Sequence, residues 1–499
     1  MQWLNQNGFG WEEPILDPLD SIEHRDALLT FHDDGSVTET EWPPARFIIG
    51  NPPFVGDKRM RRELGETYVD HLTSVFSGRL SGGSDFVCYW FEKSRAQIEV
   101  MASSRAGLLA TNSIRHGANR ETLKRINSSG AIFLAYADEP WILEGAAVRI
   151  SSIGFDDGSE KDRILDGQSV MAINPDLSSG LDLTVARMLH DNQGFAFIGI
   201  QKTGSFDVSD ELAQQWLSLP NNANGRSNSD VLRRIVNSRD LVQRFSKRWL
   251  IDFPVDMTEN EASFYEAPFR YLETNVKPKR AAKRESIAQS KWWLPTRPRP
   301  AMRIAMEGLS RYIATPRVAK HRVFVWLQVE TLPDSRLVAI ASSSDVLFGV
   351  LHSRAHEKWS LATASAHGVG NDPTYNAQSC FETYPFPWPP GQEPVDDPVV
   401  QRISAAAKEL DDMRNAWLNP EGASEAELKK RTFTNLYNAN PTWLQNLHAE
   451  LDRAVWDAYG WPAEETPAEV EEDVVLGRLL ALNLERASIP TDAVGSGAG

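Results

Sequence analysis

The sequence predicts an α/β protein in three successive parts: a largely parallel sheet, a mixed α/β segment and a helical C-terminal region. Between residues 47 and 155, short apolar runs alternate with helical patterns, which is typical of parallel strands joined by helices. The proline-dense segment 384–390 then indicates a domain boundary. After it, apolar residues recur at helical spacing in three segments, 401–416, 442–459 and 474–484.

Four apolar runs are predicted to be strands of the sheet: 47–50, 106–113, 131–135 and 147–155. Helices are predicted at 119–126 and from 85 to 98, where Asp85 is expected to be the N-cap. In parallel sheets, ligands bind at the carboxyl ends of the strands. The residues after the first strand, and Thr111-Asn112-Ser113 at the end of the second, are therefore expected on one functional edge.

The first strand runs into the tetrapeptide Asn51-Pro52-Pro53-Phe54. Two consecutive prolines cannot donate to a ladder, so the strand stops at Asn51. The Asn51 side chain offers a carbonyl acceptor, and the Pro52 carbonyl is a second acceptor fixed nearby. Two such acceptors, with Phe54 stacked on the ring, suit the amino group of a flipped-out adenine or cytosine. The alternative is a plain turn, since Asn and Pro are common turn formers.

The charge of the chain is uneven. The 499 residues carry a formal net charge of −16, and residues 1–45 hold ten Asp or Glu and one Arg. Residues 270–322 hold fourteen Lys or Arg and three Glu, and the segment from Gly56 to Gly65 is also rich in Lys and Arg. Such basic segments indicate a phosphate-binding surface, although charge runs are also common on solvated faces. Aromatic residues among these cations can stack on bases or belong to an ordinary core.

Several classes of site are disfavoured by the sequence. Cys88 and Cys380 are far apart and lack metal-ligand spacing, which argues against a disulfide framework or a zinc site and fits the cytoplasm. His321 stands among cations without a carboxylate partner, so no metal is predicted. The chain start has no basic segment followed by an apolar core, and no apolar run is long enough to cross a bilayer. No membrane partner is therefore expected.

Seven segments carry, in one consistent order, a resemblance to a known family: Ile49 to Gly56, Asp85 to Lys93, Leu109 to Arg115, Glu144 to Val148, Arg311 to Arg317, Phe348 to Ser353 and Gly368 to Pro373. The chain resembles the MmeI-like (Type IIL) DNA adenine methyltransferases of restriction-modification systems. The resemblance extends over almost the whole chain.

The resemblance implies a partial Rossmann-like class I methyltransferase domain at residues 1–165, a DNA target-recognition domain at 166–390, a helical C-terminal domain at 391–486 and a flexible tail at 487–499. It implies S-adenosyl-L-methionine as the cofactor and double-stranded DNA as a partner. By resemblance the catalytic residues are Asn51, Pro52, Pro53 and Phe54, and Asp26 falls where related enzymes hold the adenine amine of the cofactor. The residues expected to contact DNA are Lys279, Arg280, Arg311, Arg317, Lys320, Arg322 and Asn371.

The sequence departs from the family pattern at its start. Enzymes of this class bind the methionine part of the cofactor with a Gly-rich loop after the first strand, but only 25 residues precede Asp26. The segment Gly8-Phe9-Gly10 follows a polar helix end instead of a buried strand. We therefore expect the first two strands, the cofactor loop and the nuclease of some relatives to be missing. The missing first strand would leave an apolar sheet edge, which predicts a companion polypeptide, self-association or low stability.

The function expected from the resemblance is site-specific transfer of a methyl group from S-adenosyl-L-methionine to an adenine amino group of DNA, with a separate N-terminal half needed for activity. Two alternatives stay open. One is a DNA-binding specificity subunit without catalysis, and the other is an inactive truncated relic.

Overall fold

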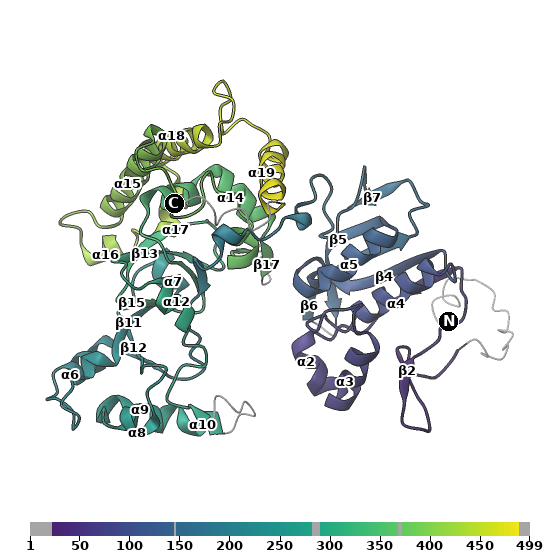
Figure 1. Cartoon of the computed structure of the whole chain (residues 1–499), viewed down its shortest axis with the longest axis horizontal. Helices are drawn as coiled ribbons and strands as arrows, with labels where there is room; N and C mark the ends of the chain where they lie inside the picture. Colours follow the sequence, from purple (N-terminus) through teal and green to yellow (C-terminus); the bar gives the residue numbers. More distant parts are fainter. Residues whose placement is uncertain (1–21, 144–145, 282–289, 368–371, 489–499) are drawn as a thin grey trace, which may run out of the picture. The chain divides into compact units, whose positions relative to one another are not determined.

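The computed structural model describes residues 22–143, 146–281, 290–367 and 372–488 (Figure 1). The chain divides into two compact units, an N-terminal unit of Met1–Gly180 and a C-terminal unit of Leu181–Gly499. The predicted domain boundaries at residues 165 and 390 stay predictions. Asn371 and the segment Gly8-Phe9-Gly10 lie outside the described residues.

A six-stranded sheet with the order β3-β4-β6-β5-β7-β8 forms the N-terminal unit. Its strands are β3 Phe47–Gly50, β4 Arg105–Thr111, β5 Ala131–Leu143, β6 Ala146–Asp156, β7 Arg163–Leu165 and β8 Gln168–Val170. Strands β3, β4, β5 and β7 run in one direction, whereas β6 and β8 run in the other. The four predicted strands are present, but the sheet is mixed instead of largely parallel. An apolar run marks a strand without giving its direction, which depends on distant partners.

Two helices cover one face of this sheet, α4 Cys88–Glu99 and α5 Gly117–Ser129 (Figure 1). Alternate residues of β4 are buried, and Ala106 and Leu108 share a hydrophobic core with side chains of both helices. Ile48 of β3 packs against the same core. Because side chains alternate across a strand, Phe47 and Ile49 project from the opposite face.

A second, smaller core lies beside the sheet, where Phe86 and Tyr89 pack with the short hairpin and helices of residues 29–75. These elements are β1 Leu29–Phe31, β2 Val37–Glu39, α2 Asp57–Leu64 and α3 Glu66–Val75. A 3-10 turn, η1 Asn112–Arg115, connects β4 to α5. Helix α2 begins at Asp57, a few residues after Asn51.

The C-terminal unit contains two four-stranded sheets, ordered β14-β13-β16-β9 and β10-β12-β11-β15, and a small hairpin of β17 and β18. The strands are β9 Ala196–Ile198, β10 Asp207–Val208, β11 Leu232–Val236, β12 Arg248–Ile251, β13 Arg311–Pro316, β14 Val325–Gln328, β15 Thr331–Pro333, β16 Leu337–Ile340, β17 Ser365–His367 and β18 Asp372–Thr374. The first sheet is antiparallel throughout, and the second contains one parallel pair, β11 with β15.

Helices of the C-terminal unit precede, connect and follow these strands. They are α6 Asp210–Leu217, α7 Ser238–Val242, α8 Glu259–Ser263, α9 Glu266–Asn275, α10 Lys277–Ala281, α12 Pro300–Ala305, α13 Asp345–His352, α14 Arg354–Ala362, α15 Pro398–Leu418, α16 Glu425–Leu428, α17 Phe433–Ala439, α18 Thr442–Ala458 and α19 Glu472–Ala487. The three predicted C-terminal helices correspond to α15, α18 and α19. Among the described helices, none is both long and apolar enough to span a membrane.

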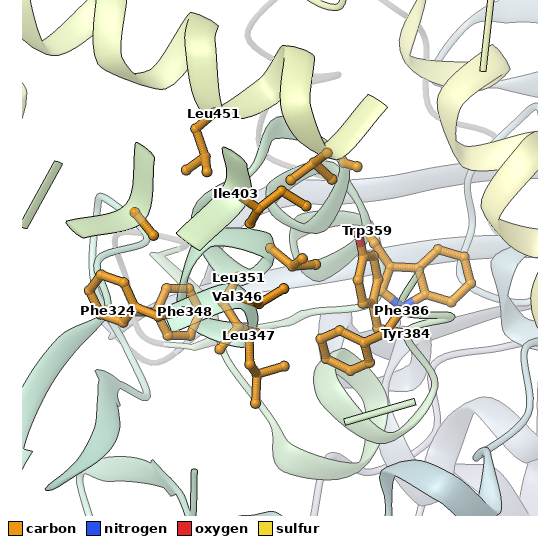
Figure 2. Close-up of a cluster of buried hydrophobic side chains, with 14 of the residues drawn as sticks. Phe324, Val346, Leu347, Phe348, Leu351, Trp359, Tyr384, Phe386, Ile403 and Leu451 are labelled. Carbon is orange, nitrogen blue, oxygen red and sulfur yellow. The ribbon is translucent and has the colours of Figure 1, made fainter. Parts of the chain in front are cut away.

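One hydrophobic core joins the last helices to the sheet of β9, β13, β14 and β16 (Figure 2). Phe348 of α13, Ile403 of α15 and Leu451 of α18 are all fully buried in it. Helices α13 and α15 approach each other closely at Gly349. A Cβ atom added to this residue would stand only 2.8 Å from Ile403 Cγ2. The helices after residue 390 therefore share a core with the segment before them.

Candidate functional site

The loop that begins at Asn51 lies at the carboxyl end of β3, as predicted. Asn51 and Pro53 are exposed, Pro52 is buried, and Phe54 is half-buried against the core under α4 and α5. The Val55 amide donates to the Pro53 carbonyl at 3.2 Å, which closes a tight turn. The loop thus presents the Asn51 side chain to solvent from a folded turn.

Residues 85 and 86 hold the end of this loop, at Val55 and Asp57, through two hydrogen bonds. The Phe86 amide donates to the Val55 carbonyl at 2.9 Å, and the Asp57 amide donates to Asp85 Oδ1 at 2.9 Å. Helix α4 starts at Cys88 with Val87 as N-cap and has no side-chain cap. The prediction of Asp85 as the N-cap is therefore wrong. Its carboxylate instead caps the start of α2.

The other oxygen of Asp85 connects the loop to the end of β4. Asp85 Oδ2 accepts from Ser113 Oγ at 2.9 Å and from Asn119 Nδ2 at 2.7 Å, and the Asp85 amide donates to Asn119 Oδ1 at 2.7 Å. Ser113 and Thr111 also share a hydrogen bond of 2.6 Å. We name Asp85, Ser113 and Asn119 the loop anchor. It brings the predicted edge residues after β4 together with the Asn51 loop.

A second polar contact lies at the same strand end. Asn112 Nδ2 donates to Asp138 Oδ1 at 3.0 Å, and Arg149 donates to the same oxygen at 2.5 Å. This hydrogen bond and the negative charge of Asp138 raise the pKa of Arg149 above its usual value. Asn112 is therefore positioned by β5 and β6 instead of by the Asn51 loop.

Asp26, the predicted cofactor residue, is exposed but already accepts three hydrogen bonds. Its Oδ1 accepts from the amides of Leu28 and Leu29 at 2.8 and 2.9 Å, and its Oδ2 accepts from the Tyr68 hydroxyl at 3.0 Å. Burial, followed by the charge of Asp26, raises the pKa of Tyr68. A carboxylate has about four acceptor positions. Asp26 thus keeps about one for a ligand amine.

The helix after the loop carries an exposed basic surface. Lys58, Arg59, Arg61 and Arg62 of α2 are exposed, whereas Met60 is buried in the second core. Three of these cations form ion pairs with acidic residues of α2 and α3: Arg59 and Arg62 with Glu63, and Arg61 with Asp70. Exposed pairs of this kind contribute little stability and are easily exchanged for another anion.

Two of the residues predicted to bind DNA are buried. Arg280 is 2% exposed and donates to several backbone carbonyls, among them that of Leu294 at 2.6 Å and that of Lys202 at 2.7 Å. Arg322 is 9% exposed and donates to the Pro316 carbonyl at 2.7 Å. Both guanidinium groups face the protein interior. The structure therefore gives Arg280 and Arg322 a structural role in place of the predicted phosphate contact.

The other predicted DNA contacts stand nearer the surface. Lys279 is exposed, and exposed Lys320 donates to Asn438 at 2.9 Å. Arg311 pairs with Asp345 at 2.7 Å and lies over the Trp326 ring. Arg317 is half-buried, with a hydrogen bond of 3.3 Å to the Ser335 carbonyl. Within the described ranges, no group of acidic, histidine and cysteine side chains has the arrangement of a metal site.

The site consists of a sheet edge, an anchored Asn-Pro-Pro-Phe loop and a basic helix. Residues 11–166 match the family described as "MmeI, DNA-methyltransferase domain". The chain is 22% identical over 464 residues to DNA methyltransferase A of Bacillus subtilis (strain 168), which covers 85% of this chain and 47% of that protein.

The fold is similar to that of the Type IIL restriction-modification enzyme MmeI, solved in complex with DNA. The TM-score is 0.67 at 21% sequence identity, and the match covers 89% of this chain and 57% of that one. The family model over residues 11–166 and the similar fold support an MmeI-like assignment. The chain spans about half the length of the curated relative that it matches.

Proposed function

We propose that the chain is the target-binding part of a site-specific DNA methyltransferase that acts on the amino group of adenine in a restriction-modification system. The observation that carries the proposal is the Asn51-Pro52-Pro53-Phe54 loop at the carboxyl end of β3. The loop anchor holds its later end, where Asp85 accepts from the Asp57 amide and from Ser113. The family match over residues 11–166 supports the same activity.

The proposed role of the loop is to hold the amino group of the target base. The Asn51 side-chain carbonyl and the Pro52 backbone carbonyl accept the two amine hydrogens, and Phe54 stacks on the base that has left the duplex. Held in this way, the nitrogen lone pair points away from both acceptors and toward an incoming methyl group. Asp85 fixes the later end of the loop by accepting from the Asp57 amide, which limits rearrangement of the loop during the reaction. Adenine is preferred over cytosine on the family resemblance alone.

S-adenosyl-L-methionine is the proposed methyl donor, but the described residues do not fit it completely. Asp26 is the one predicted contact to the cofactor among them, and it has about one acceptor position left. Within the described ranges, no Gly-rich loop follows a buried strand beside β3. We therefore propose that a companion polypeptide carries the other half of the donor site.

Contact with DNA phosphates is assigned to exposed cations. The exposed ones are Lys58, Arg59, Arg61 and Arg62 of α2 in the N-terminal unit, and Lys279 and Lys320 in the C-terminal unit; the half-buried Arg311 and Arg317 are assigned the same role. Asn371 stays a predicted contact without structural support. A protein that modifies cellular DNA is expected in the cytoplasm.

The second candidate is a DNA-binding specificity subunit without catalysis. The incomplete donor site favours it, because target binding needs only the loop and the basic residues. An inactive relic is the third candidate. Cooperative thermal unfolding of the purified chain would count against the relic.

The decisive experiment compares the wild type with Asn51→Ala in its native cells. Adenine methylation of the genome is mapped by single-molecule sequencing after deletion of the gene and its return as either form. We expect one methylated sequence motif to depend on the gene, and Asn51→Ala to lower its methylation rate by about 100-fold or more. Asn415→Ala, at an exposed position of α15, is the matched control and retains methylation. Sequence-preferring DNA binding without any gene-dependent methylation would favour the specificity subunit.

A further inference from the structure

Two adjoining hollows border helix α7 in the C-terminal unit. The larger has a volume of about 550 Å³ and the smaller a volume of about 260 Å³, and both are lined by Arg239, Gln243 and Thr434. Helix α7 contacts α17, and residues of both helices line both hollows (Figure 1). Small-molecule sites have volumes of roughly 300–1,000 Å³. The two hollows together therefore have the size of a ligand site.

The larger hollow is strongly basic, and we name it the basic hollow. Its lining includes four cations and one carboxylate: Arg239, Arg244, Arg248, Lys429 and Asp240. The Asp240 carboxylate is buried and already accepts from the amides of Asn237 and Ser246 at 2.9 and 2.8 Å. The hollow thus holds an excess of positive charge in a chain whose formal net charge is −16.

Three of the four cations are able to reach a bound anion. Arg239, Arg248 and Lys429 are exposed, and within the described ranges neither arginine forms an ion pair. Lys429 pairs with Glu425 at 3.1 Å, but both side chains are largely exposed, and such pairs are weak. An arginine binds a phosphate group through two parallel hydrogen bonds. The basic hollow therefore suits a ligand with several phosphate oxygens.

The walls of the basic hollow are held in place by hydrogen bonds. The fourth cation, Arg244, donates to the carbonyls of Leu418 and Leu428 at 2.7 and 2.8 Å. Thr434 Oγ1 donates to the Val242 carbonyl at 3.2 Å. These contacts join the segment around α7 to the segment that holds the end of α15, α16 and α17. A site that is formed before binding loses less free energy to ordering when the ligand arrives.

The smaller hollow has a different lining, and we name it the apolar hollow. Every residue that lines the basic hollow has a polar side chain, whereas the apolar hollow is lined by five apolar residues: Val242, Val318, Ala319, Val323 and Phe433. Lys320 and His321 also line it. Apolar side chains with a few polar groups are the usual lining of a site for a ring-shaped ligand group. The apolar hollow therefore suits a heteroaromatic base.

A DNA duplex does not use both hollows. The phosphates of a duplex lie on its outside and meet cations on an outward-facing surface, such as the exposed cations of α2. Its paired bases are stacked inside and present only their edges in the grooves, so the apolar hollow would stay empty. A compact ligand that joins several phosphates to one base fills both hollows at once.

We propose that the basic and apolar hollows together bind one nucleoside triphosphate. Its phosphates contact Arg239, Arg248 and Lys429, and its base lies in the apolar hollow. The sugar between them faces the wall that the hollows share, at Gln243 and Thr434. The site belongs to the C-terminal unit and makes no use of the Asn51 loop, so it is additional to the proposed methyl-transfer site.

The experiment titrates the purified full chain with ATP and with GTP by isothermal titration calorimetry. We expect at least one of them to bind with a Kd below about 1 mM, and pyrophosphate, which lacks a base, to bind at least about ten-fold more weakly. Arg248→Gln and Arg239→Gln should each weaken nucleotide binding by about ten-fold or more, because each removes a charged donor to phosphate. Arg270→Gln, at an exposed position of α9, is the matched control and keeps the affinity of the wild type.

Photolabelling with the 8-azido analogue of the bound nucleotide locates the base. We expect the label on residues 318–323 or 433–434, and urea denaturation should show that both arginine variants are folded. The site is refuted if neither nucleotide binds, if pyrophosphate binds as tightly as the nucleotide, or if the label lies elsewhere. Displacement of the nucleotide by duplex DNA, with an equal loss of DNA affinity in Arg248→Gln, would make the basic hollow a DNA contact instead. None of these measurements involves methyl transfer, so failure of the proposed function leaves their outcome unchanged.

Discussion

Lys279 and Arg280 are neighbours in sequence and have opposite surroundings. Lys279 is exposed on α10, whereas the Arg280 guanidinium donates to backbone carbonyls inside the C-terminal unit and lies over the Phe206 ring. Composition shows that residues 270–322 are basic, but it does not show which cations face inward. Burial of an arginine among carbonyls depends on how segments far apart in sequence fold together.

We predict that Arg280→Ala destabilises the protein and that Lys279→Ala does not. Arg280→Ala removes the guanidinium that donates to the buried carbonyls of Trp292 and Leu294, which costs about 3 kcal/mol of unfolding free energy. Lys279→Ala changes stability by less than about 0.5 kcal/mol. Urea denaturation of both variants measures the difference. Equal stabilities would contradict the structural role of Arg280.

Asp85 is the site residue whose role the sequence did not reveal. Its position just before an aromatic helix predicts an N-cap, but its carboxylate binds the start of α2 and the residues after β4. The signal was present in the resemblance, where Asp85 opens a matching segment. An N-cap is a local arrangement, whereas the loop anchor joins residues from 57 to 119, and no sequence spacing encodes that contact.

At the scale of elements, the sequence predicted the bounds of strands and helices better than their order and direction in the sheet. The starts of β3, β4, β5 and β6 agree with the apolar runs within one residue, and the C-terminal helices α15, α18 and α19 agree within about three. The order β4-β6-β5 could not be predicted, since it depends on pairing between β4 and β6, whose paired residues are 39 to 51 positions apart. The hairpin of β1 and β2 was missed because its strands have only three residues each.

Helix α2 is expected to act as a phosphate contact beside the Asn51 loop. The double variant Lys58→Gln and Arg62→Gln should reduce the slope of log K against log salt concentration for DNA binding by about 1 to 2, because each phosphate contact contributes about 0.9. Fluorescence anisotropy with double-stranded DNA at several salt concentrations measures this slope. Lys429→Gln, at an exposed position of α16's end, is the control with an unchanged slope. An unchanged slope in the double variant would remove α2 from the DNA interface.

The joint between α18 and α14 is expected to be sensitive to pH. Asp452 of α18 accepts the Arg354 amide at 2.6 Å, at the start of α14. Burial, with the nearby charge of Glu357, raises the pKa of Asp452 to about 7. The native carboxyl thus keeps its proton up to about pH 7, whereas an unfolded Asp loses it near pH 4. The native state therefore loses stability as pH rises between these values.

Asp452→Asn keeps the acceptor and removes this titration. Relative to the wild type, the variant should gain up to about 3 kcal/mol of unfolding free energy between pH 5 and pH 8. Urea denaturation at both pH values provides the measurement. Asp412→Asn, at an exposed position of α15, is the control and follows the wild type. A variant that loses stability with pH as steeply as the wild type would disprove the raised pKa.

At the scale of the whole molecule, the described part of the N-terminal unit holds the proposed target-base loop and one predicted cofactor contact, Asp26. We predict that the purified chain transfers no detectable methyl group from S-adenosyl-L-methionine to DNA. A radiolabelled methyl-transfer assay on genomic DNA from a strain lacking the gene tests this, with a known adenine methyltransferase as the positive control. Robust transfer that is abolished by Asn51→Ala would prove the chain complete in itself.

The placement of β6 between β4 and β5 also determines the order in which the sheet can fold. Strands β5 and β6 are close in sequence and pair first, because local contacts form faster than distant ones. Strand β4 gains its antiparallel partner only when β6 is in place, and β3 pairs with β4 alone among the described strands. We therefore expect the loop carrying Asn51, which is synthesised before the rest of its sheet, to become ordered last.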